Sequence, residues 1–243
     1  MRYDRTAKNK GHEGAIMNVL VVAAHPDDEV LGCGGTIARF VKEGNTVYTL
    51  ILGEGITSRD EKRDRYKNEE EIKKLKSHMK AASKIIGVKD AFVFDFPDNR
   101  FDSVALLDMV KTVETIKKRV NPDIIFTHHQ GDLNIDHQIT FRAVMTAFRP
   151  MRGEKAKEVY SFEVPSSTEW NAPIPASYFM PNYFIDVSNT LELKIKAMKE
   201  YKSEIMEYPH PRSPEAIRIY ARFRGIQVGL EAAEAFEVIR MIR

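Results

Sequence analysis

Apolar runs alternate with amphipathic stretches along the first half of the chain. Four short apolar runs are predicted to be strands: 18–24, 46–52, 91–96 and 123–129. Three stretches with helical spacing of their apolar residues separate them: 34–45, 68–87 and 104–120. Continuous apolar runs are typical of parallel strands covered on both faces, and a 3.6-residue period is typical of helices packed on a sheet. The alternation therefore predicts an α/β fold with a mostly parallel sheet.

The pattern changes after Pro150. Two more extended segments are predicted, at 159–164 and 183–187, with a loop rich in Pro, Ser and Asn between them. Helical spacing returns over 190–206, and two further helical patterns are predicted to fill 214–242. Because no linker composition flanks Pro150, we expect this part to be a C-terminal helical elaboration of the same domain.

The chain of 243 residues is long enough to bury a sizeable core as one domain, which we place at 17–243. Residues 1–16 are polar and basic and are expected to form a flexible leader. The 37 Lys and Arg residues nearly balance the 35 Asp and Glu residues, which gives no electrostatic argument for a nucleic-acid partner. No run approaches the about 18–20 apolar residues of a membrane span. The single cysteine, Cys33, fits a reducing, cytoplasmic compartment.

Charged residues crowd the segment AAHPDDEVLGCGGT (23–36), which overlaps the end of the first predicted strand. A second cluster, THHQGDLNIDHQ (127–138), lies at the end of the fourth. Ligands of open α/β folds gather at the carboxyl ends of the strands, so both clusters are expected to converge on one cation. We predict His25, Asp28 and His137 as its ligands, because two imidazoles and one carboxylate leave an open position, as in catalytic zinc sites. Another divalent metal remains an alternative, since availability also decides occupancy.

The first cluster contains two further carboxylates, Asp27 and Glu29, that are not predicted to bind the metal. Asp27 adjoins a ligand and is predicted to take a proton from a metal-activated water and return it to a leaving nitrogen. Glu29 supports the loop or caps the following helix, and Cys33 is expected to be a small packed side chain. Either cluster alone could consist of helix caps and solvated histidines, but two clusters at two strand ends favour a metal site.

The first cluster, together with NIDHQ further along, resembles the PIG-L/LmbE-like family of zinc-dependent de-N-acetylases. Similarity extends from Met17 through three more segments: FPDNR (96–100), FEVPSSTEW (162–170) and PHPRSPEAI (209–217). The resemblance implies a Rossmann-like three-layer sandwich, one catalytic zinc and hydrolysis of an acetamide on an amino sugar. By motif it assigns His25, Asp28 and His137 as ligands and Asp27 as the base, in agreement with the spacing.

The second motif departs from the family pattern. Many members have His-x-Asp-His, but this chain has Asn134 in place of the first histidine. That histidine commonly stabilises the oxyanion, and losing one oxyanion donor costs about 10²–10³ in rate, so a substitute is expected. We predict His210 for this role, reaching in from a neighbouring subunit, with His129 as second choice; an ordinary surface position is the alternative for His210. Asp136 is expected to orient one of these imidazoles, with helix capping as the alternative.

Four residues are candidates for substrate binding: Arg63, Asn134, Trp170 and Arg212. The forked donors of the two arginines suit a phosphate or a hydroxyl group. Trp170 lies in a stretch rich in Pro and Asn that could form a sugar-facing lid. Solvated arginines and structural packing of the tryptophan are the alternatives.

Together these features predict a zinc-dependent hydrolase that removes the N-acetyl group from an N-acetylglucosamine-type amino sugar or its conjugate. We expect a homo-oligomer with a small-molecule substrate. One alternative is an amidase that cleaves a larger acyl group from a glucosamine conjugate. The other is a non-catalytic, metal-containing module that binds a sugar or nucleotide. A third carboxylate in the first cluster argues against that module, because a binding site gains nothing from an uncompensated charge.

Overall fold

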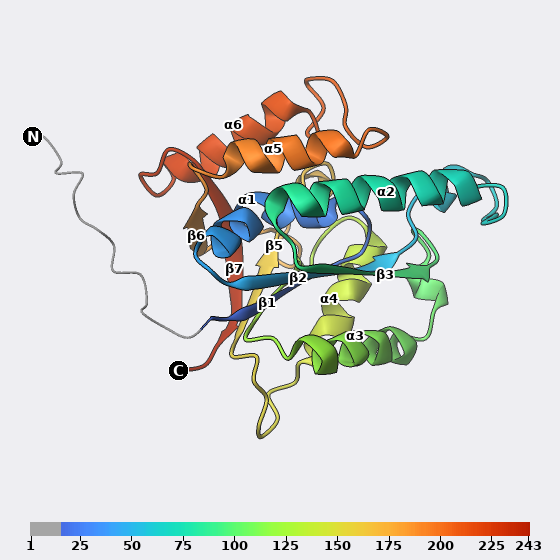
Figure 1. The fold of residues 1–243 in the computed structure, drawn as a ribbon, viewed down its shortest axis with the longest axis horizontal. Helices are drawn as coiled ribbons and strands as arrows, with labels where there is room; N and C mark the ends of the chain where they lie inside the picture. Colours follow the sequence, from blue (N-terminus) through green and yellow to red (C-terminus); the bar gives the residue numbers. More distant parts are fainter. Residues whose placement is uncertain (1–15) are drawn as a thin grey trace, which may run out of the picture.

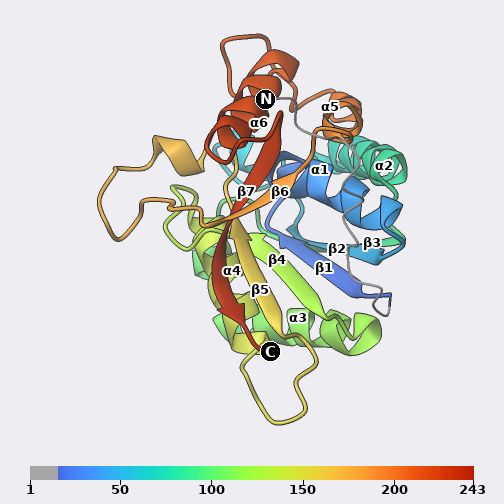
Figure 2. The same cartoon turned by 90° about the vertical axis from the view of Figure 1, so that its left-hand side faces the viewer.

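The computed structural model describes residues 16–243, so the predicted leader lies outside the described residues except for Ile16. Within that range seven strands form one sheet in the order β3-β2-β1-β4-β5-β7-β6. Their bounds are β1 Asn18–Ala23, β2 Thr46–Gly53, β3 Asp90–Phe96, β4 Ile124–His128, β5 Glu158–Phe162, β6 Tyr183–Asp186 and β7 Ala233–Met241. β1 to β5 pair in parallel, whereas β7 runs antiparallel between β5 and β6 (Figure 2). The predicted α/β fold with a mostly parallel sheet is confirmed.

Helices cover both faces of the sheet and make a three-layer sandwich (Figure 1). One face carries α1 Asp28–Lys42, α2 Glu69–Ile86, α5 Leu191–Glu200 and α6 Pro214–Ile226. The other carries α3 Leu106–Val120 and α4 Ile135–Ala147. Three short 3₁₀ helices lie in the connections: η1 Thr57–Arg59, η2 Phe101–Ser103 and η3 Thr168–Trp170. No helix among residues 16–243 is both long enough and apolar enough to cross a membrane.

Helix α1 begins at Asp28 rather than at the predicted residue 34. Asp27, immediately before it, has a positive φ of 110°, and its carbonyl accepts the N–H groups of Val30 (3.0 Å) and Leu31 (2.9 Å). The first glycine of the motif then allows close packing, since a Cβ on Gly32 would stand only 2.3 Å from the Phe162 ring. Gly32 thus lets α1 pack closely on β5, and Asp28 stands in the first turn of this helix.

Two predictions for the C-terminal part are wrong. The second helical pattern within 214–242 is β7, which fills the sheet between β5 and β6. Its Ala- and Glu-rich start favours a helix locally, but pairing with two strands overrides that preference. The helix predicted over 190–206 ends at Glu200, after which Tyr201 turns inward and is fully buried. The C-terminal elaboration is therefore a mixture of helices and strands.

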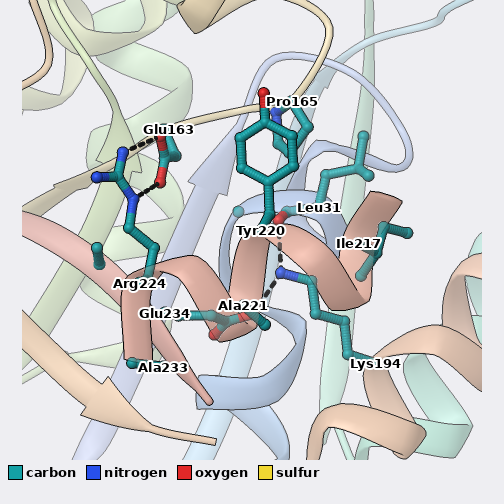
Figure 3. A pocket seen from close by; sticks show the side chains of 12 residues that line it. Leu31, Glu163, Pro165, Lys194, Ile217, Tyr220, Ala221, Arg224, Ala233 and Glu234 are labelled. Carbon is teal, nitrogen blue, oxygen red and sulfur yellow. Dashed lines mark hydrogen bonds and ion pairs between the residues drawn. The ribbon is translucent and has the colours of Figure 1, made fainter. Parts of the chain in front are cut away.

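A buried ion pair ties α5 to β7 and α1 (Figure 3). Lys194 Nζ lies 2.6 Å from Glu234 Oε1 and donates to the Leu31 carbonyl at 2.7 Å. Glu234 also accepts the N–H groups of Gly35 (3.0 Å) and Thr36 (2.7 Å). A cavity of about 30 Å³ adjoins the pair, space for about one water. The buried charges of Lys194 and Glu234 are thus paired and hydrogen-bonded where α1 packs on the sheet.

Candidate metal centre

The two histidine and aspartate clusters meet between β1 and β4. These strands are neighbours, but the helices that follow them, α1 and α4, cover opposite faces of the sheet (Figure 1). Ligands of open α/β sheets bind at such a switch point, outside the carboxyl ends of the strands. A cavity of about 270 Å³ opens there, and its lining includes His25, Asp27, Asp28 and His137. The predicted convergence of the two clusters is thus present in the structure.

The three predicted ligands lie close enough to share one cation. Asp28 Oδ2 is 3.4 Å from His25 Nδ1 and 3.2 Å from His137 Nε2, and one donor atom from each residue lies within 4.8 Å of the others. Bonds of about 2.0–2.1 Å in a tetrahedron place neighbouring donors about 3.3 Å apart. The donor set and its spacing therefore fit the tetrahedral spacing of a divalent metal, and all three residues line the cavity.

Asp136 holds the first of these imidazoles from behind. Its Oδ2 lies 2.9 Å from His25 Nε2, while the N–H groups of Asn99 (2.6 Å) and Phe101 (2.9 Å) donate to its two oxygens. Asp98 also approaches His25 Nε2, at 3.3 Å, which makes a second group of possible metal donors. Asp136 therefore lies against His25 and not against His129 or His210, the imidazoles that it was expected to orient, and α4 is capped by Asn134 instead of Asp136. The contact fixes the His25 ring, whose Nδ1 faces Asp28.

Two residues that the sequence analysis left without a role complete the centre. Asp132 Oδ1 lies 3.1 Å from His137 Nδ1, on the side away from Asp28. Burial lowers the pKa of His137, but Asp28 and Asp132 outweigh it and raise that pKa to about 9. His128 stacks on His137 with ring centroids 3.9 Å apart, and its Nε2 accepts the Ala24 N–H at 2.8 Å. The pair of histidines at the end of β4 was the available signal, but the sequence pattern could not tell which ring faces the centre.

Asp27 is held from two directions beside the ligands. Its N–H donates to Glu29 Oε2 (3.0 Å), and Tyr201 Oη donates to Glu29 Oε1 (2.5 Å). On the other side, Arg212 Nη1 lies 3.2 Å from Asp27 Oδ2. Burial raises the pKa of Asp27 well above its usual range, although Arg212 opposes this. The result is a fixed carboxylate in the cavity with a greater proton affinity than an exposed aspartate has.

Two of the predicted substrate residues line the same cavity. Arg212 reaches it from the segment before α6, and its Nε donates to Ser166 Oγ at 2.8 Å. Asn134 caps α4, because its Oδ1 accepts the Asp136 N–H at 2.8 Å, and its Nδ2 donates to Asn99 Oδ1 at 3.0 Å. Asn134 therefore combines the capping role with a place on the cavity wall.

Trp170 and His210 lie beside this cavity. Both line an adjoining cavity of about 330 Å³, and their rings meet nearly perpendicularly, with centroids 5.9 Å apart. Within the described part of this chain His210 does not line the cavity of the metal ligands. Its role as oxyanion donor stays a prediction that would need a second subunit.

Arg63 and His129 have partners elsewhere. The Arg63 guanidinium makes two hydrogen bonds to the buried carboxylate of Glu54, at 2.7 and 3.0 Å, and among the described residues it is not part of the cavity lining. His129 Nδ1 lies 2.8 Å from Glu237 Oε2, and its Nε2 lies 3.1 Å from the Ser177 carbonyl. Since both ring nitrogens are engaged, this geometry gives His129 no free donor for an oxyanion.

The sequence and the fold of the chain are similar to those of known proteins. The family model PIG-L, described as GlcNAc-PI de-N-acetylase, matches residues 20–148. The chain is 28% identical to the uncharacterized deacetylase YaiS of Escherichia coli, over 76% of this chain and 90% of that protein. It is 23% identical to diacetylchitobiose deacetylase of Thermococcus kodakarensis, over 92% of this chain and 84% of that protein. The crystal structure of the conserved protein TT1542 from Thermus thermophilus superposes with a TM-score of 0.72 at 23% identity, covering 94% of this chain and 97% of that one.

Proposed function

The chain belongs to the PIG-L family of de-N-acetylases, and we propose that it is a zinc-dependent hydrolase that removes the acetyl group from an N-acetylglucosamine-type sugar or conjugate. One observation carries the proposal. The buried carboxylate of Asp27 lies in the same cavity as the cluster of His25, Asp28 and His137. A site that only binds would gain nothing from this second carboxylate, whereas a hydrolase needs a proton acceptor there.

The residues of the chain divide the work of amide hydrolysis. His25, Asp28 and His137 would hold the metal, which when bound supplies Lewis acidity and lowers the pKa of a water to about 7. Asp27 accepts a proton as the water oxygen bonds to the acetyl carbon. The same carboxyl group then gives that proton to the sugar nitrogen as the C–N bond breaks, which yields acetate and a primary amine. Arg212 and Glu29 keep the Asp27 side chain and backbone in place during both transfers.

The test is release of primary amine and acetate by zinc-reconstituted protein. The panel runs from free N-acetylglucosamine through N,N′-diacetylchitobiose to nucleotide-linked and lipid-linked forms. We expect equal amounts of amine and acetate from at least one member. Release of a longer acid from N-acyl analogues instead would favour the larger-acyl amidase. Binding without any release would favour the non-catalytic module.

Asp136→Asn is expected to weaken zinc binding about 10–100-fold, the usual cost of losing a partner that orients a ligand histidine. An amide offers only one acceptor oxygen for the Asn99 and Phe101 N–H groups and cannot fix the His25 ring in the same way. Competition with a chromophoric chelator measures the affinity. Asp102→Asn, an exposed carboxylate on η2, is the matched control. Wild-type affinity in Asp136→Asn would contradict the orienting role.

Tyr201→Phe is expected to lower the free energy of unfolding by about 1–3 kcal/mol, because it removes a donor from the buried Glu29 carboxylate. It should also lower kcat without loss of zinc, since Glu29 holds the Asp27 backbone. Urea unfolding and steady-state kinetics measure the two effects. Tyr160→Phe is the control, because this buried tyrosine also donates to a glutamate, Glu158, but remote from the cavity. A fall in kcat of the same size in both variants would contradict a specific role for Tyr201.

The predicted homo-oligomer would supply the second subunit that the His210 hypothesis requires. Light scattering on the zinc-loaded protein tests the assembly. A monomer with full activity would remove His210 from the list of oxyanion donors. The cytoplasmic location stays a prediction from the single cysteine.

A further inference from the structure

We propose that Ile56 and Leu75 close an apolar corner of the metal-centre cavity around the methyl group of the acetamide, and thereby exclude acyl chains longer than acetyl. This inference rests on the proposed de-N-acetylase function and adds the residues that select the acyl group. Among the described residues that line the cavity, all but four carry polar side chains; the four are Pro26, Gly55, Ile56 and Leu75, together called the acyl corner. The methyl group is the apolar end of the acetamide, so its burial is favourable at this part of the wall.

The acyl corner begins beside the reacting groups. Pro26 stands in the chain between His25, a proposed ligand, and Asp27, the proposed base. Its ring packs near Gly55, since a Cβ on Gly55 would stand 3.4 Å from Pro26 Cδ and 2.9 Å from Leu75 Cδ2. An acetamide whose carbonyl carbon faces the water that Asp27 deprotonates can therefore place its methyl group against this apolar surface.

Ile56 has a backbone conformation that β-branched residues rarely adopt. Its φ is 74° and its ψ is −44°, and the Thr57 N–H donates to the Gly55 carbonyl at 2.8 Å. These angles and this hydrogen bond are those of the rare, strained γ-turn with a positive φ. Such strain is found at functional sites, where the surrounding structure maintains it. The turn places Ile56 on the cavity wall, where only 7% of the residue remains exposed.

The buried carboxylate of Glu54 maintains this turn. Its Oε1 accepts the Thr57 hydroxyl at 2.8 Å and the Arg63 Nε–H at 2.7 Å. Its Oε2 accepts a second Arg63 N–H at 3.0 Å, and Arg65 Nε lies 2.9 Å from the same oxygen. Glycine would adopt the conformation of Ile56 without strain. The cost of the turn is therefore tied to keeping an isoleucine side chain at this point of the wall.

Leu75 closes the acyl corner from behind. It belongs to α2, is 2% exposed and lies with Ile56 in the apolar core on the α1 face of the sheet. Close-packed cores resist the insertion of even one additional methylene group. A propionyl or longer chain would have to push into this core or turn toward the polar wall, and either course weakens binding. The methyl group of an acetyl chain requires neither.

The kinetic test uses the N-acetyl, N-propionyl and N-butyryl forms of the sugar that releases amine in the substrate panel. In the wild-type protein kcat/KM should fall about 10–200-fold with the first added methylene. Ile56→Gly and Leu75→Ala should each raise the ratio of kcat/KM for propionyl to that for acetyl about tenfold or more. Ile56→Gly also relieves the strain of the turn, so it stays informative if Leu75→Ala does not fold. Ile72→Ala is the control, because it shortens a buried side chain of α2 that is not among the described lining residues, and it should leave the ratio unchanged.

Binding to zinc-loaded Asp27→Asn protein tests the acyl corner without turnover. Calorimetric titration with N-acetyl-, N-propionyl- and N-butyrylglucosamine should show an affinity that falls with chain length, and the fall should be smaller when Ile56→Gly or Leu75→Ala is added. Equal affinity for the three compounds, an unchanged fall in both variants, or no binding of any compound would overturn the inference. Acetyl-selective binding without amine release by the wild-type protein would contradict the proposed function alone. Equal amine release from acetyl and butyryl substrates would contradict the acyl corner alone.

Discussion

Asp27→Asn is expected to lower kcat/KM about 10²–10⁴-fold, the contribution of a positioned general base. Asparagine keeps the size of the side chain and the backbone N–H that Glu29 accepts, but it cannot take a proton. The proposed ligands His25, Asp28 and His137 remain, so zinc content should equal that of the wild-type protein. Amine release gives the rate, and metal analysis of the same samples gives the zinc content.

The matched control for this change is Asp95→Asn. It makes the same replacement of an aspartate by an asparagine, but at an exposed position. The Asp95 side chain is 42% accessible and pairs with Arg65. We expect activity within the error of the wild-type rate. If Asp27→Asn retained substantial activity with full zinc content, another group would have to move the proton. Loss of zinc together with activity would instead assign Asp27 to the ligands.

The proposed ligands could be predicted from the sequence because the ends of buried strands can be predicted. A continuous apolar run indicates a buried parallel strand, and the residues that follow such strands lie at one edge of the sheet. His25 follows β1 directly, whereas His137 lies in the first turn of α4, the helix after β4, and both contact Asp28 at that edge. Neighbouring residues of a strand point to opposite faces, so a one-residue difference in register decides whether His128 or His129 faces the centre. The pattern alone could not fix that register.

The groups that hold Asp27 were harder to foresee. Tyr201, Glu204 and Arg212 all belong to the connection between α5 and α6, which folds back over the start of α1. The periodicity of apolar residues predicts helices and strands, but it does not predict that a connecting segment will pack against a helix far away along the chain. The strand β7 was missed for a related reason, since its partners β5 and β6 lie far away along the chain. Local propensity predicts an element well only where its neighbours agree with it.

Lys194→Met is expected to lower the free energy of unfolding by about 3–5 kcal/mol, because it leaves the buried Glu234 carboxylate without its counter-charge. Methionine replaces the apolar stem of the lysine side chain atom for atom and lacks only the terminal amino group. Among the described residues, Glu234 would keep as hydrogen-bond donors the N–H groups of Gly35 and Thr36. Urea unfolding followed by circular dichroism measures the loss. Lys155→Met removes a partly exposed lysine paired with Asp123, and as the control it should change stability by only about 0–1 kcal/mol.

A double variant separates loss of charge balance from loss of packing. Adding Glu234→Gln to Lys194→Met removes the uncompensated charge, although the single glutamine oxygen replaces the two carboxylate oxygens that accept the Gly35 and Thr36 N–H groups. Removing the charge of both partners of a buried pair is often close to neutral, so the double variant should recover part of the lost stability. Equal stability of the single and double variants would show that packing alone is responsible. Recovery would mean that the stability lost in Lys194→Met comes from the uncompensated Glu234 charge, which is buried where the N–H groups of α1 meet β7.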